Sequence, residues 1–448
     1  MSNDFFEKAS QKLMESNEID RNLYTELDVK RGLRNADGSG VLAGLTKISG
    51  VVGSKKIDGK LEPVEGNLMY RGIDIVDLVS GYQKEGRHGF AEVAHLLLFG
   101  NLPNSGELRV FEENLYPRMG LPRRLVNASI LTYTSSHVMN ALQRVVQTLY
   151  VMDDNPDDIS TPNVIRQSME LIAKLPTATA YSLMALKHKF NGEALHIAPP
   201  NSDYDLAQNF LYMLRPNGQF SVLEAELLDL ALILHAEHGG GNNSSFTAHV
   251  VSSSHTDTYS AISAAIGSLK GPLHGAANAN VMYMMSNVKD NVKDWKDKDE
   301  VAAYIEKIVA KKAHDKTGLV YGMGHAVYTK SDPRAVVLKD KARDLANAKG
   351  RSDEYQLYLN IEELTPGIFQ KVKGSTKVIS PNVDFFSGFV YDMLGFPQEI
   401  YTPLFAMARV VGWCAHRMDE LLNGGRIIRP GYKSVAEKRS FTPMKNRS

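Results

Sequence analysis

The 448-residue sequence lacks the features that mark secreted, membrane and nucleic-acid-binding proteins. Its one cysteine, Cys414, cannot form a disulfide within the chain, which favours a reducing compartment, and we expect a cytoplasmic protein. Apolar runs of about eighteen residues are absent. The start, MSNDFFEKAS, has no basic region followed by an apolar one, so we expect neither a membrane span nor a signal peptide. Lys plus Arg and Asp plus Glu each number 51, which leaves no net field to recruit nucleic acid or a membrane.

Alternating strand patterns are also scarce, and most of the chain has apolar residues at helical spacing. One hairpin is expected in KIDGKLEPVEGNLMYRG, where Asp58-Gly59 is a turn signal. The fold class is therefore predicted to be all-α. The clearest helical segments are AEVAHLLLFGNLP, which should stop at Gly100, and SHVMNALQRVVQTLYVMDDNP, NVIRQSMELIAKLP, SVLEAELLDLALILHAEHGGG, GPLHGAANANVMYMMSNV, DEVAAYIEKIVAKK and TPLFAMARVVGWCAHRMDELLNGG.

Charge is unevenly distributed, and Val288 to Arg351 is the most charged region. Apolar, glycine-punctuated segments near His274 and Asp384 border it. This pattern predicts a small domain, 276–382, inserted between two parts of a large domain, with a cleft between the domains. The parts of the large domain are 1–275 with an N-terminal arm and 383–448 with a C-terminal tail. Polar residues 16–45 and 430–448 are expected to be disordered or to reach a partner.

The segment LHAEHGGGNN places His238 at a helix end, followed by glycines and Asn242. The dipole of a helix C-terminus favours a protonated imidazole, which suits anion binding. A helix-capping histidine beside a flexible loop is the structural alternative. A metal site is a further alternative, because His235 and His238 share a helix face and His249 and His255 follow. No HExxH motif and no paired cysteines support a metal, so we expect none.

In LKGPLHGAANAN, Gly271-Pro272 breaks one helix and His274 lies near the start of the next. A helix N-terminus disfavours a positive charge, so a neutral imidazole is expected there. A neutral imidazole can donate a hydrogen bond to a developing enolate oxygen, as one does in an unrelated isomerase. Close helix packing with an incidental histidine is the alternative.

The segment GLVYGMGHAVYTKSDPRA surrounds His325 with glycines and ends in Arg334. Gly322 and Gly324 permit unusual backbone angles and close approach of a ligand. A dinucleotide fingerprint is not met, because Val327 stands where the third glycine is needed. Asp-Pro before Arg334 favours a turn that positions the guanidinium, which binds carboxylates through two parallel hydrogen bonds. A simple surface turn is the alternative.

The segment PNVDFFSGFVYDMLGFP places Asp384 in the first turn of a helix, among aromatic residues. Aromatic surroundings desolvate a carboxylate and raise its pKa, which suits a general base, although an ordinary first-turn acid is the alternative. Arg409 lies amid apolar residues of ARVVGW and needs a partner. Arg429 stands in the irregular tail segment GGRIIRPGYKS, where a solvated residue is the ordinary interpretation.

Together these segments resemble the citrate synthase family. The ordered set comprises LHAEHGGGNNSSFTAH, GPLHGAAN, GMGHAVYTKSDPRA, PNVDFFSGFVYDMLGFP and ARVVGW with IIRP, and the resemblance runs from about Tyr70 to Pro430. It implies an almost wholly helical fold, with a small domain that closes over a large one, in a homodimer or higher homo-oligomer. The implied reaction condenses acetyl-CoA with oxaloacetate and hydrolyses the thioester, without a metal or redox cofactor.

The resemblance also implies a role for each residue. Asp384 would take a proton from the acetyl methyl group, His274 would steady the enolate oxygen, and His325 would hydrogen-bond and protonate the oxaloacetate carbonyl. The loop with Gly322 and Gly324 would approach CoA. The residues that bind oxaloacetate or citrate would be His238, Asn242, Arg334, Phe405, Arg409 and, from the neighbouring subunit, Arg429.

Two positions depart from the pattern of many family members. Ala326 stands where many carry Arg, and Thr329 where some carry a basic residue, so no residue is assigned to the CoA phosphates. A 2-methylcitrate synthase, which uses propionyl-CoA, and a bifunctional enzyme fit the motifs equally well. The alternatives from other classes are a histidine-metal hydrolase and a non-catalytic helical scaffold. Allosteric control and the choice between dimer and hexamer are not readable from the sequence.

Overall fold

A computed structural model of the chain describes residues 3–58, 60–375 and 378–447. The chain divides into two compact units, Met1–Leu45 and Thr46–Ser448. In the first unit the described elements are α1 (Asn3–Ser16), α2 (Asn22–Glu26) and the 3-10 helix η1 (Arg31–Leu33). Residues 5–45 include no buried side chain, so this unit has no core of its own in the part that is described.

The second unit is helical apart from one small sheet, which confirms the predicted all-α class. Its strands are β1 (Ser49–Ile57), β2 (Lys60–Tyr70) and β3 (Ile73–Asp74). Its α-helices are α3 (Ile75–Glu85), α4 (Phe90–Phe99), α5 (Ser105–Leu115), α6 (Arg123–Leu125), α7 (Val138–Met152), α8 (Thr161–Asn191), α9 (Leu206–Leu214), α10 (Val222–His235), α11 (Asn243–Ser252), α12 (Thr258–Lys270), α13 (Pro272–Gly275), α14 (Ala277–Asn291), α15 (Lys298–Val309), α16 (Pro333–Ala348), α17 (Ser352–Lys373), α18 (Val383–Met393) and α19 (Tyr401–Asp419). Short 3-10 or π turns are η2 (Tyr116–Arg118), η3 (Val126–Thr132), η4 (Gln398–Ile400), η5 (Glu420–Gly424) and η6 (Met444–Asn446).

The expected hairpin is confirmed, and it supports the loop that carries His325. β1 and β2 pair antiparallel from Ser49 opposite Tyr70 to Ile57 opposite Lys60; Gly59 of the expected turn lies outside the described residues. A side chain at Gly53 or Gly66 would collide with the backbone, because a Cβ there would lie 2.2 Å from the Val327 carbonyl oxygen or 2.0 Å from that of Ser331. Glycine therefore lets the hairpin lie directly against the loop.

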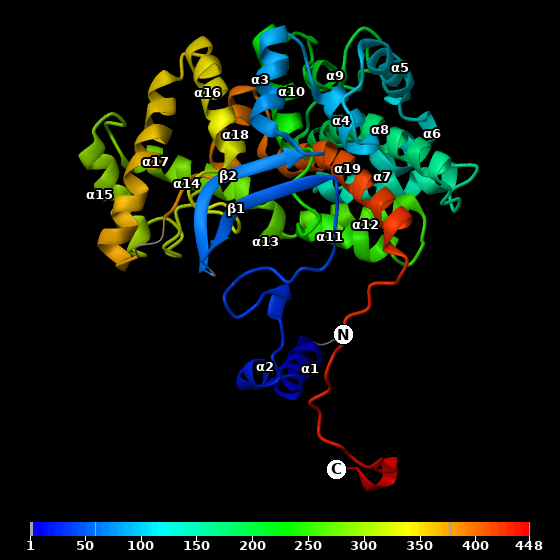
Figure 1. The fold of residues 1–448 in the computed structure, drawn as a ribbon, viewed down its shortest axis with the longest axis vertical. Helices are drawn as coiled ribbons and strands as arrows, with labels where there is room; N and C mark the ends of the chain where they lie inside the picture. Colours follow the sequence, from blue (N-terminus) through cyan, green and yellow to red (C-terminus); the bar gives the residue numbers. More distant parts are fainter. Residues whose placement is uncertain (1–2, 59, 376–377, 448) are drawn as a thin grey trace. The chain divides into compact units, whose positions relative to one another are not determined.

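The core of the second unit surrounds α19, drawn in orange in Figure 1, which packs against α4, α8, α10, α11 and α12. Apolar residues cover all faces of α19, and every residue from Ala406 to Met418 is buried. α10, which packs beside it, begins at a capping box in which Ser221 and Glu224 satisfy each other's backbone N–H groups. α4 ends as expected at Gly100, whose φ of +96° closes the helix.

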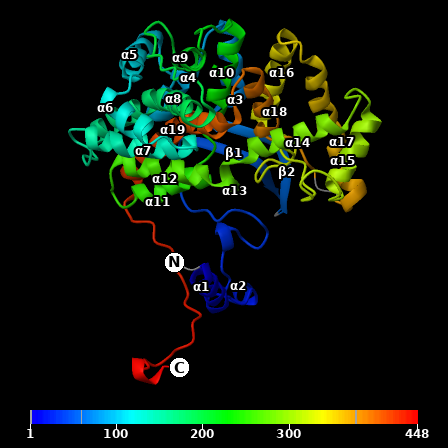
Figure 2. The ribbon, with the colours of Figure 1, turned by 180° about the vertical axis from the view of Figure 1, so that it is seen from behind.

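Helices α14 to α18 group on one side of the second unit, as both Figure 1 and Figure 2 show. Within this group α18 packs against α14 and α16, and α15 packs against α17. The helix ends that face the core bring Arg334 of α16 and Asp384 of α18 beside α19. The predicted division into domains 1–275, 276–382 and 383–448 stays a prediction.

α8 extends beyond the segment NVIRQSMELIAKLP and passes through Pro176 to Asn191. Proline lacks a backbone N–H and usually ends a helix. Here the residues around Pro176 are buried on every side, so packing offsets the lost hydrogen bond. No helix in the described part of the chain is both long and apolar enough to cross a bilayer.

Candidate active site

Eight residues singled out from the sequence line one cavity of about 130 Å³. The eight residues come from α13, α16, α18, α19 and the loops around them: His238, Asn242, His274, His325, Arg334, Asp384, Phe405 and Arg409. Segments that are distant in the sequence thus meet at one point.

Arg334 is fixed at the start of α16 by the residue that caps the helix. Both Nε and Nη2 of Arg334 donate to the carboxylate of Asp332, at 3.0 and 2.8 Å, and Asp332 also accepts from the Arg334 backbone N–H. Burial alone would lower the pKa of Arg334, but Asp332 raises it above its usual value. The same carboxylate accepts from the N–H of Val383, at 3.2 Å, and so holds the first turns of α16 and α18 together.

Arg409 is a second buried cation, and it is only 2% exposed. Its Nε donates to the carbonyl of His235 at 2.6 Å, and its guanidinium lies 5.9 Å from the ring centre of Phe405. No other hydrogen bond of this side chain occurs within the described ranges. Its terminal nitrogens are therefore free to bind a carboxylate in the cavity.

His325 is held in one tautomer by its own loop. Its Nδ1 accepts hydrogen bonds from the backbone N–H groups of Val327, at 3.0 Å, and Tyr328, at 3.1 Å. Nδ1 therefore carries no proton, and Nε2 carries the N–H. Burial, and then the charge of Arg334, lower the pKa of His325 to about 4, so the ring is a neutral donor at pH 7.

The loop before His325 has the unusual backbone that its glycines predicted. Gly322 and Gly324 have φ of +79° and +101°. A Cβ at Gly322 would lie 2.8 Å from the ring of Phe385. The Gly322 carbonyl accepts from the N–H of Asn382, and the Gly324 N–H donates to the carbonyl of Ser380. These bonds tie the loop to the start of α18; neither glycine lines the cavity.

His274 is neutral, as expected, but the expected cause is wrong. It lies in the four-residue helix α13, which is too short to provide a strong dipole. Burial, followed by the positive charge of Arg409, lowers the pKa of His274 to about 4. Its Nε2 lies 3.1 Å from the hydroxyl of Ser244. That hydroxyl donates its proton to Oδ1 of Asn242 at 2.8 Å, so the contact with His274 is one in which Nε2–H donates to Ser244.

Asp384 occupies the first turn of α18, next to the capping residue Asn382, and is half-buried at the wall of the cavity. Burial raises the pKa of Asp384 to about 6, although the charges of Arg334 and Arg409 act in the opposite direction. At pH 7 the carboxylate is ionised yet more basic than an ordinary aspartate. That combination suits proton abstraction.

The expectation that His238 is protonated is wrong. α10 ends at His235, and His238 lies beyond it in a buried turn, where its Nε2 is 3.2 Å from the hydroxyl of Tyr328. Burial, and then the charges of Arg334 and Arg409, lower the pKa of His238 well below its usual value. Burial and two nearby arginines outweigh the helix dipole, so His238 acts as a neutral hydrogen-bonding group.

Asn242 caps α11 and also faces the cavity, and Phe405 stacks on His235 with ring centres 3.7 Å apart. Arg429, like Gly322 and Gly324, does not line the cavity, and it is exposed in the tail of its own chain. Among the described residues, no three His, Cys, Asp or Glu side chains are placed to share a metal ion.

A larger cavity, about 630 Å³, lies between the starts of α4 and α9 and the end of α5. Its two basic side chains each meet a carboxylate: His88 contacts Asp205, and Arg87 bonds Glu92, which lies outside the lining, at 2.6 Å. The smaller cavity differs because it holds cations with free donors, neutral imidazoles and a basic carboxylate together. Chemistry, and not size, identifies it as the candidate active site.

Three supporting residues were not singled out from the sequence: Ser244, Tyr328 and Glu237. Ser244 accepts from the indole N–H of Trp413 at 3.1 Å and adjoins His274. Tyr328 stacks on His325 with ring centres 4.8 Å apart. All three stand within or beside the quoted motifs, so proximity in the sequence was the available signal. Their partners come from distant elements, and this the sequence does not reveal.

Comparisons with known proteins agree on one family. A family model described as "Citrate synthase, C-terminal domain" matches residues 36–431. A citrate synthase from Haloferax volcanii is 36% identical, with 94% of this chain and 99% of that protein covered. A 2-methylcitrate synthase from Corynebacterium glutamicum is 34% identical over 90% of this chain and 98% of its own length. The citrate synthase of Thermoplasma acidophilum, solved with carboxymethyl coenzyme A and oxaloacetate, is 27% identical, with a TM-score of 0.76 over 94% of this chain and 99% of that one.

Proposed function

The chain belongs to the citrate synthase family, and we propose that the cavity lined by Arg334, Asp384 and Arg409 is where it performs the family's reaction. The protein is a citrate synthase, an acyltransferase whose substrates are oxaloacetate and an acyl-CoA. Acetyl-CoA and oxaloacetate condense, and hydrolysis of the thioester then releases citrate and CoA. The single observation that carries the assignment of the site is that a basic carboxylate, three neutral imidazoles and two buried arginines face one small cavity.

The first step is removal of a proton from the methyl group of acetyl-CoA. We assign this step to Asp384, whose raised pKa makes it a stronger base than an ordinary aspartate. A carboxylate alone is poorly matched to a carbon acid, so the developing enolate oxygen needs a partner. We assign that part to His274, whose lowered pKa leaves it a neutral hydrogen-bond donor at pH 7.

The second step joins the enolate carbon to the carbonyl carbon of oxaloacetate. We assign Arg334 and Arg409 to the two carboxylates, with His238 and Asn242 as neutral hydrogen-bonding groups and Phe405 as an apolar wall. His325 presents its Nε2–H to the carbonyl oxygen and transfers that proton as the oxygen becomes an alkoxide. A neutral imidazole is a weak acid, which suits the weakly acidic hydroxyl group that forms.

The third step hydrolyses the citryl thioester. We propose that the helices α14 to α17 close over the cavity, so that water is excluded until condensation is complete. The loop with Gly322 and Gly324 lies at the edge of this cavity and is assigned to the CoA moiety, because its bare backbone permits close approach.

We propose that a homodimer, or a higher homo-oligomer, completes the site with Arg429 of the neighbouring subunit. Two observations support this. Arg429 is exposed in its own chain, and the described residues after Gly424 include no buried side chain although Ile427, Tyr432 and Phe441 are apolar and exposed. Exposed apolar side chains of this kind are covered when subunits pair. We also place the protein in the cytoplasm, since its only cysteine is a buried thiol.

The acyl group is the remaining choice. A 2-methylcitrate synthase is 34% identical to this chain, close to the 36% of a citrate synthase. Acetyl and propionyl differ by one methylene, which a pocket separates by only about 1–3 kcal/mol. A 2-methylcitrate synthase, or a bifunctional enzyme that accepts both acyl groups, is therefore the second candidate.

One experiment tests these assignments: release of CoA by the purified protein with oxaloacetate and either acetyl-CoA or propionyl-CoA, with and without a chelator. Faster turnover of acetyl-CoA, unchanged by the chelator, is the expected result. Faster turnover of propionyl-CoA would move the protein to 2-methylcitrate synthesis with the same residues. No thiol release with either would contradict the assignment of the site.

A further inference from the structure

Two carboxylates and two histidines form a continuous hydrogen-bonded chain beside the active site. Glu237 Oε1 lies 2.9 Å from His416 Nε2, His416 Nδ1 lies 3.1 Å from His249 Nε2, and His249 Nδ1 lies 2.9 Å from Glu420 Oε2. The side chains of Glu237 and His416 are 0% exposed. Those of His249 and Glu420 are 15% and 12% exposed. The reaction steps assigned above use none of the four.

The hydrogen bonds between the four side chains determine how many protons they hold. Each terminal carboxylate accepts a proton from the histidine beside it, which uses His416 Nε2–H and His249 Nδ1–H. If both rings were neutral, the two nitrogens that face each other at 3.1 Å, His416 Nδ1 and His249 Nε2, would each carry a lone pair and no proton. One further proton must lie between them, so one of the two rings is an imidazolium.

The extra proton is placed on His416, because its partner Glu237 is fully buried and needs a countercharge beside it, whereas Glu420 is partly exposed. Burial lowers the pKa of His249, and the positive charge of His416 lowers it further against the opposing effect of Glu420. Burial opposes ionisation of Glu237, yet the charge and hydrogen bond of His416 hold the pKa of Glu237 at about 2. The inner end of the chain is thus a buried ion pair between Glu237 and His416.

Glycines leave the space that these hydrogen-bonded side chains occupy. A Cβ at Gly412 of α19 would lie 2.1 Å from Glu237 Oε2, and one at Gly240 would lie 3.2 Å from the ring of His416. Gly239 donates its N–H to Glu237 Oε1 at 2.5 Å with φ of +89°. Gly239 and Gly240, which follow His238, therefore serve these hydrogen bonds as well as the turn.

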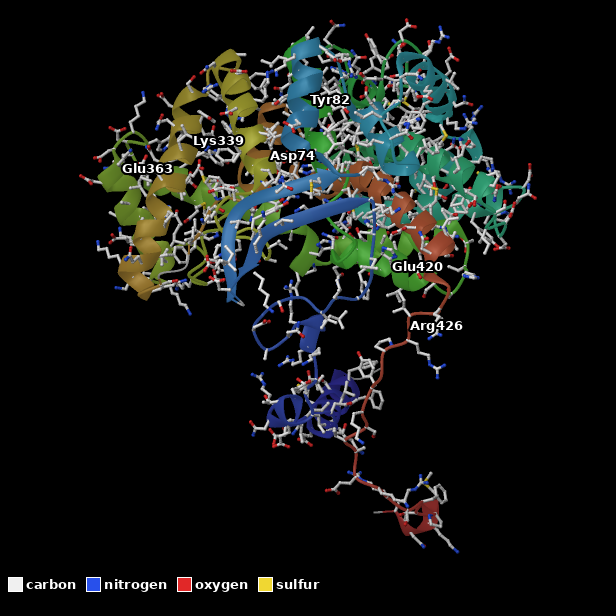
Figure 3. All side chains as sticks on the ribbon, in the orientation of Figure 1. Asp74, Tyr82, Lys339, Glu363, Glu420 and Arg426 are labelled. Carbon is white, nitrogen blue, oxygen red and sulfur yellow. The ribbon has the colours of Figure 1, made fainter. Side chains whose placement is uncertain are left out.

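The inner end of the chain adjoins the oxaloacetate site. Glu237 precedes His238 in the sequence, and the charge of Glu237 raises the pKa of Arg409 against the larger effect of burial, which lowers it. Arg334 and the Tyr70 hydroxyl also face this region, and Asp419 acts on His249 at the outer end. The outer carboxylate, Glu420, begins η5, just before the chain continues to Arg426 and the tail (Figure 3).

We propose that His416 is a positioning residue for oxaloacetate binding: its imidazolium balances the charge of Glu237, so that Arg409 stays available to a substrate carboxylate. Without that charge, Glu237 would compete with oxaloacetate for Arg409 across the buried space between them. His249 and Glu420 hold His416 in place from the other side. This inference rests on the proposed function, since it gives Arg409 its role in binding oxaloacetate.

A pair of variants separates charge balance from simple packing. His416→Gln keeps a donor for Glu237 but carries no charge. Glu237→Gln/His416→Gln removes both charges. The amide oxygen of glutamine can replace Oε1 of Glu237, so the donors from Ser49, Gly239 and residue 416, which all point to that oxygen, keep their acceptor. Neutral pairs often replace buried ion pairs without loss of stability, so the double variant is expected to fold. His188→Gln, at an exposed histidine of α8, is the matched control.

The measurements are the Kd of oxaloacetate by calorimetry, steady-state kinetics with acetyl-CoA, and Tm. In His416→Gln we expect the Kd and KM of oxaloacetate to rise about tenfold, with kcat and the KM of acetyl-CoA within about twofold. The double variant should return the Kd to within about threefold of wild type, a coupling that independent structural losses would not produce.

An unchanged Kd in His416→Gln would overturn the proposal. A double variant that binds oxaloacetate more weakly than His416→Gln would also overturn it. If the single variant fails to fold, the double variant still provides the test: should it fold and yet bind oxaloacetate far more weakly than wild type, the proposal is wrong. Turnover by the wild-type protein and by His188→Gln, measured first, tests the proposed function separately, because neither depends on the balance between Glu237 and His416.

Discussion

Asp384 combines the two properties that a base for a carbon acid needs. Its carboxylate reaches the cavity, and burial holds its pKa at about 6, well above that of an exposed aspartate. The same burial keeps His274 and His325 neutral, each with a pKa of about 4. One physical cause therefore makes the acid more basic and the imidazoles uncharged, because burial disfavours the charged form of both.

Asp384→Asn is expected to lower kcat by about 100- to 10,000-fold, the usual contribution of a general base. The Kd of oxaloacetate should change little, because other residues bind it. Steady-state kinetics and calorimetry measure both. Asp392→Asn, on the same helix but outside the cavity, is the control and should keep kcat. Equal turnover in Asp384→Asn and wild type would remove Asp384 from the mechanism.

The pH dependence follows from the same carboxylate. Asp384 acts in its ionised form, so kcat/KM should fall as pH drops below about 6, with protonation of one group. His274 and His325 are already neutral above pH 5, so they should add no second limb between pH 5 and 8. A profile of kcat/KM for acetyl-CoA from pH 5 to 8 checks this. A rate that rises on acidification would mean that the essential group acts in its protonated form.

At the scale of elements, α19 can lie close to the turn after α10 only because Gly412 has no side chain. Gly412 donates its N–H to the carbonyl of Ala236, outside the pattern of its own helix, at 3.2 Å. A Cβ at Gly412 would lie 2.6 Å from that carbonyl oxygen and closer still to Glu237. The backbone at Ala236 and Glu237 continues directly into His238, so a shift of that backbone would also move His238 of the cavity.

Gly412→Ala should therefore lower the free energy of unfolding by about 1–3 kcal/mol, as overpacking of a core does. Gly367→Ala in α17 is the matched control, because a Cβ there meets nothing within 4 Å. That variant should gain about 0.5–1 kcal/mol, since alanine is the better helix former. Chemical denaturation of both measures the difference. A stable Gly412→Ala variant would show that α19 and the turn can separate without cost.

At the scale of the whole molecule, one chain presents every proposed site residue except Arg429. Asp384→Asn and Arg429→Gln should each be nearly inactive alone. In a dimer of the two, one site has both Asp384 and the partner's Arg429, whereas the other has neither. If Arg429 acts across the interface, coexpression should restore about a quarter of wild-type activity by random pairing. No recovery in mixed dimers would place Arg429 in the site of its own chain or outside any site.

Local signals in the sequence were sufficient for much of the fold. Helical spacing and caps located α4, α10 and α19, and an Asp-Gly signal located the hairpin of β1 and β2. Local signals were insufficient where packing overrides them. Pro176 does not end α8, because buried contacts on all sides offset its missing hydrogen bond.

The sequence by itself was sufficient to select side chains that meet at one cavity, because their motifs are contiguous: His274, His325, Arg334, Asp384 and Arg409 all line it. Only the tertiary structure decided their charges. His238 was expected to be protonated and is neutral, because it is buried and because two arginines, from α16 and α19, add their charges nearby. The hydrogen-bonded series of side chains from Glu237 to Glu420 could not be predicted from the sequence for the same reason. Burial and charge act between residues that are distant in the sequence and meet only in the folded protein.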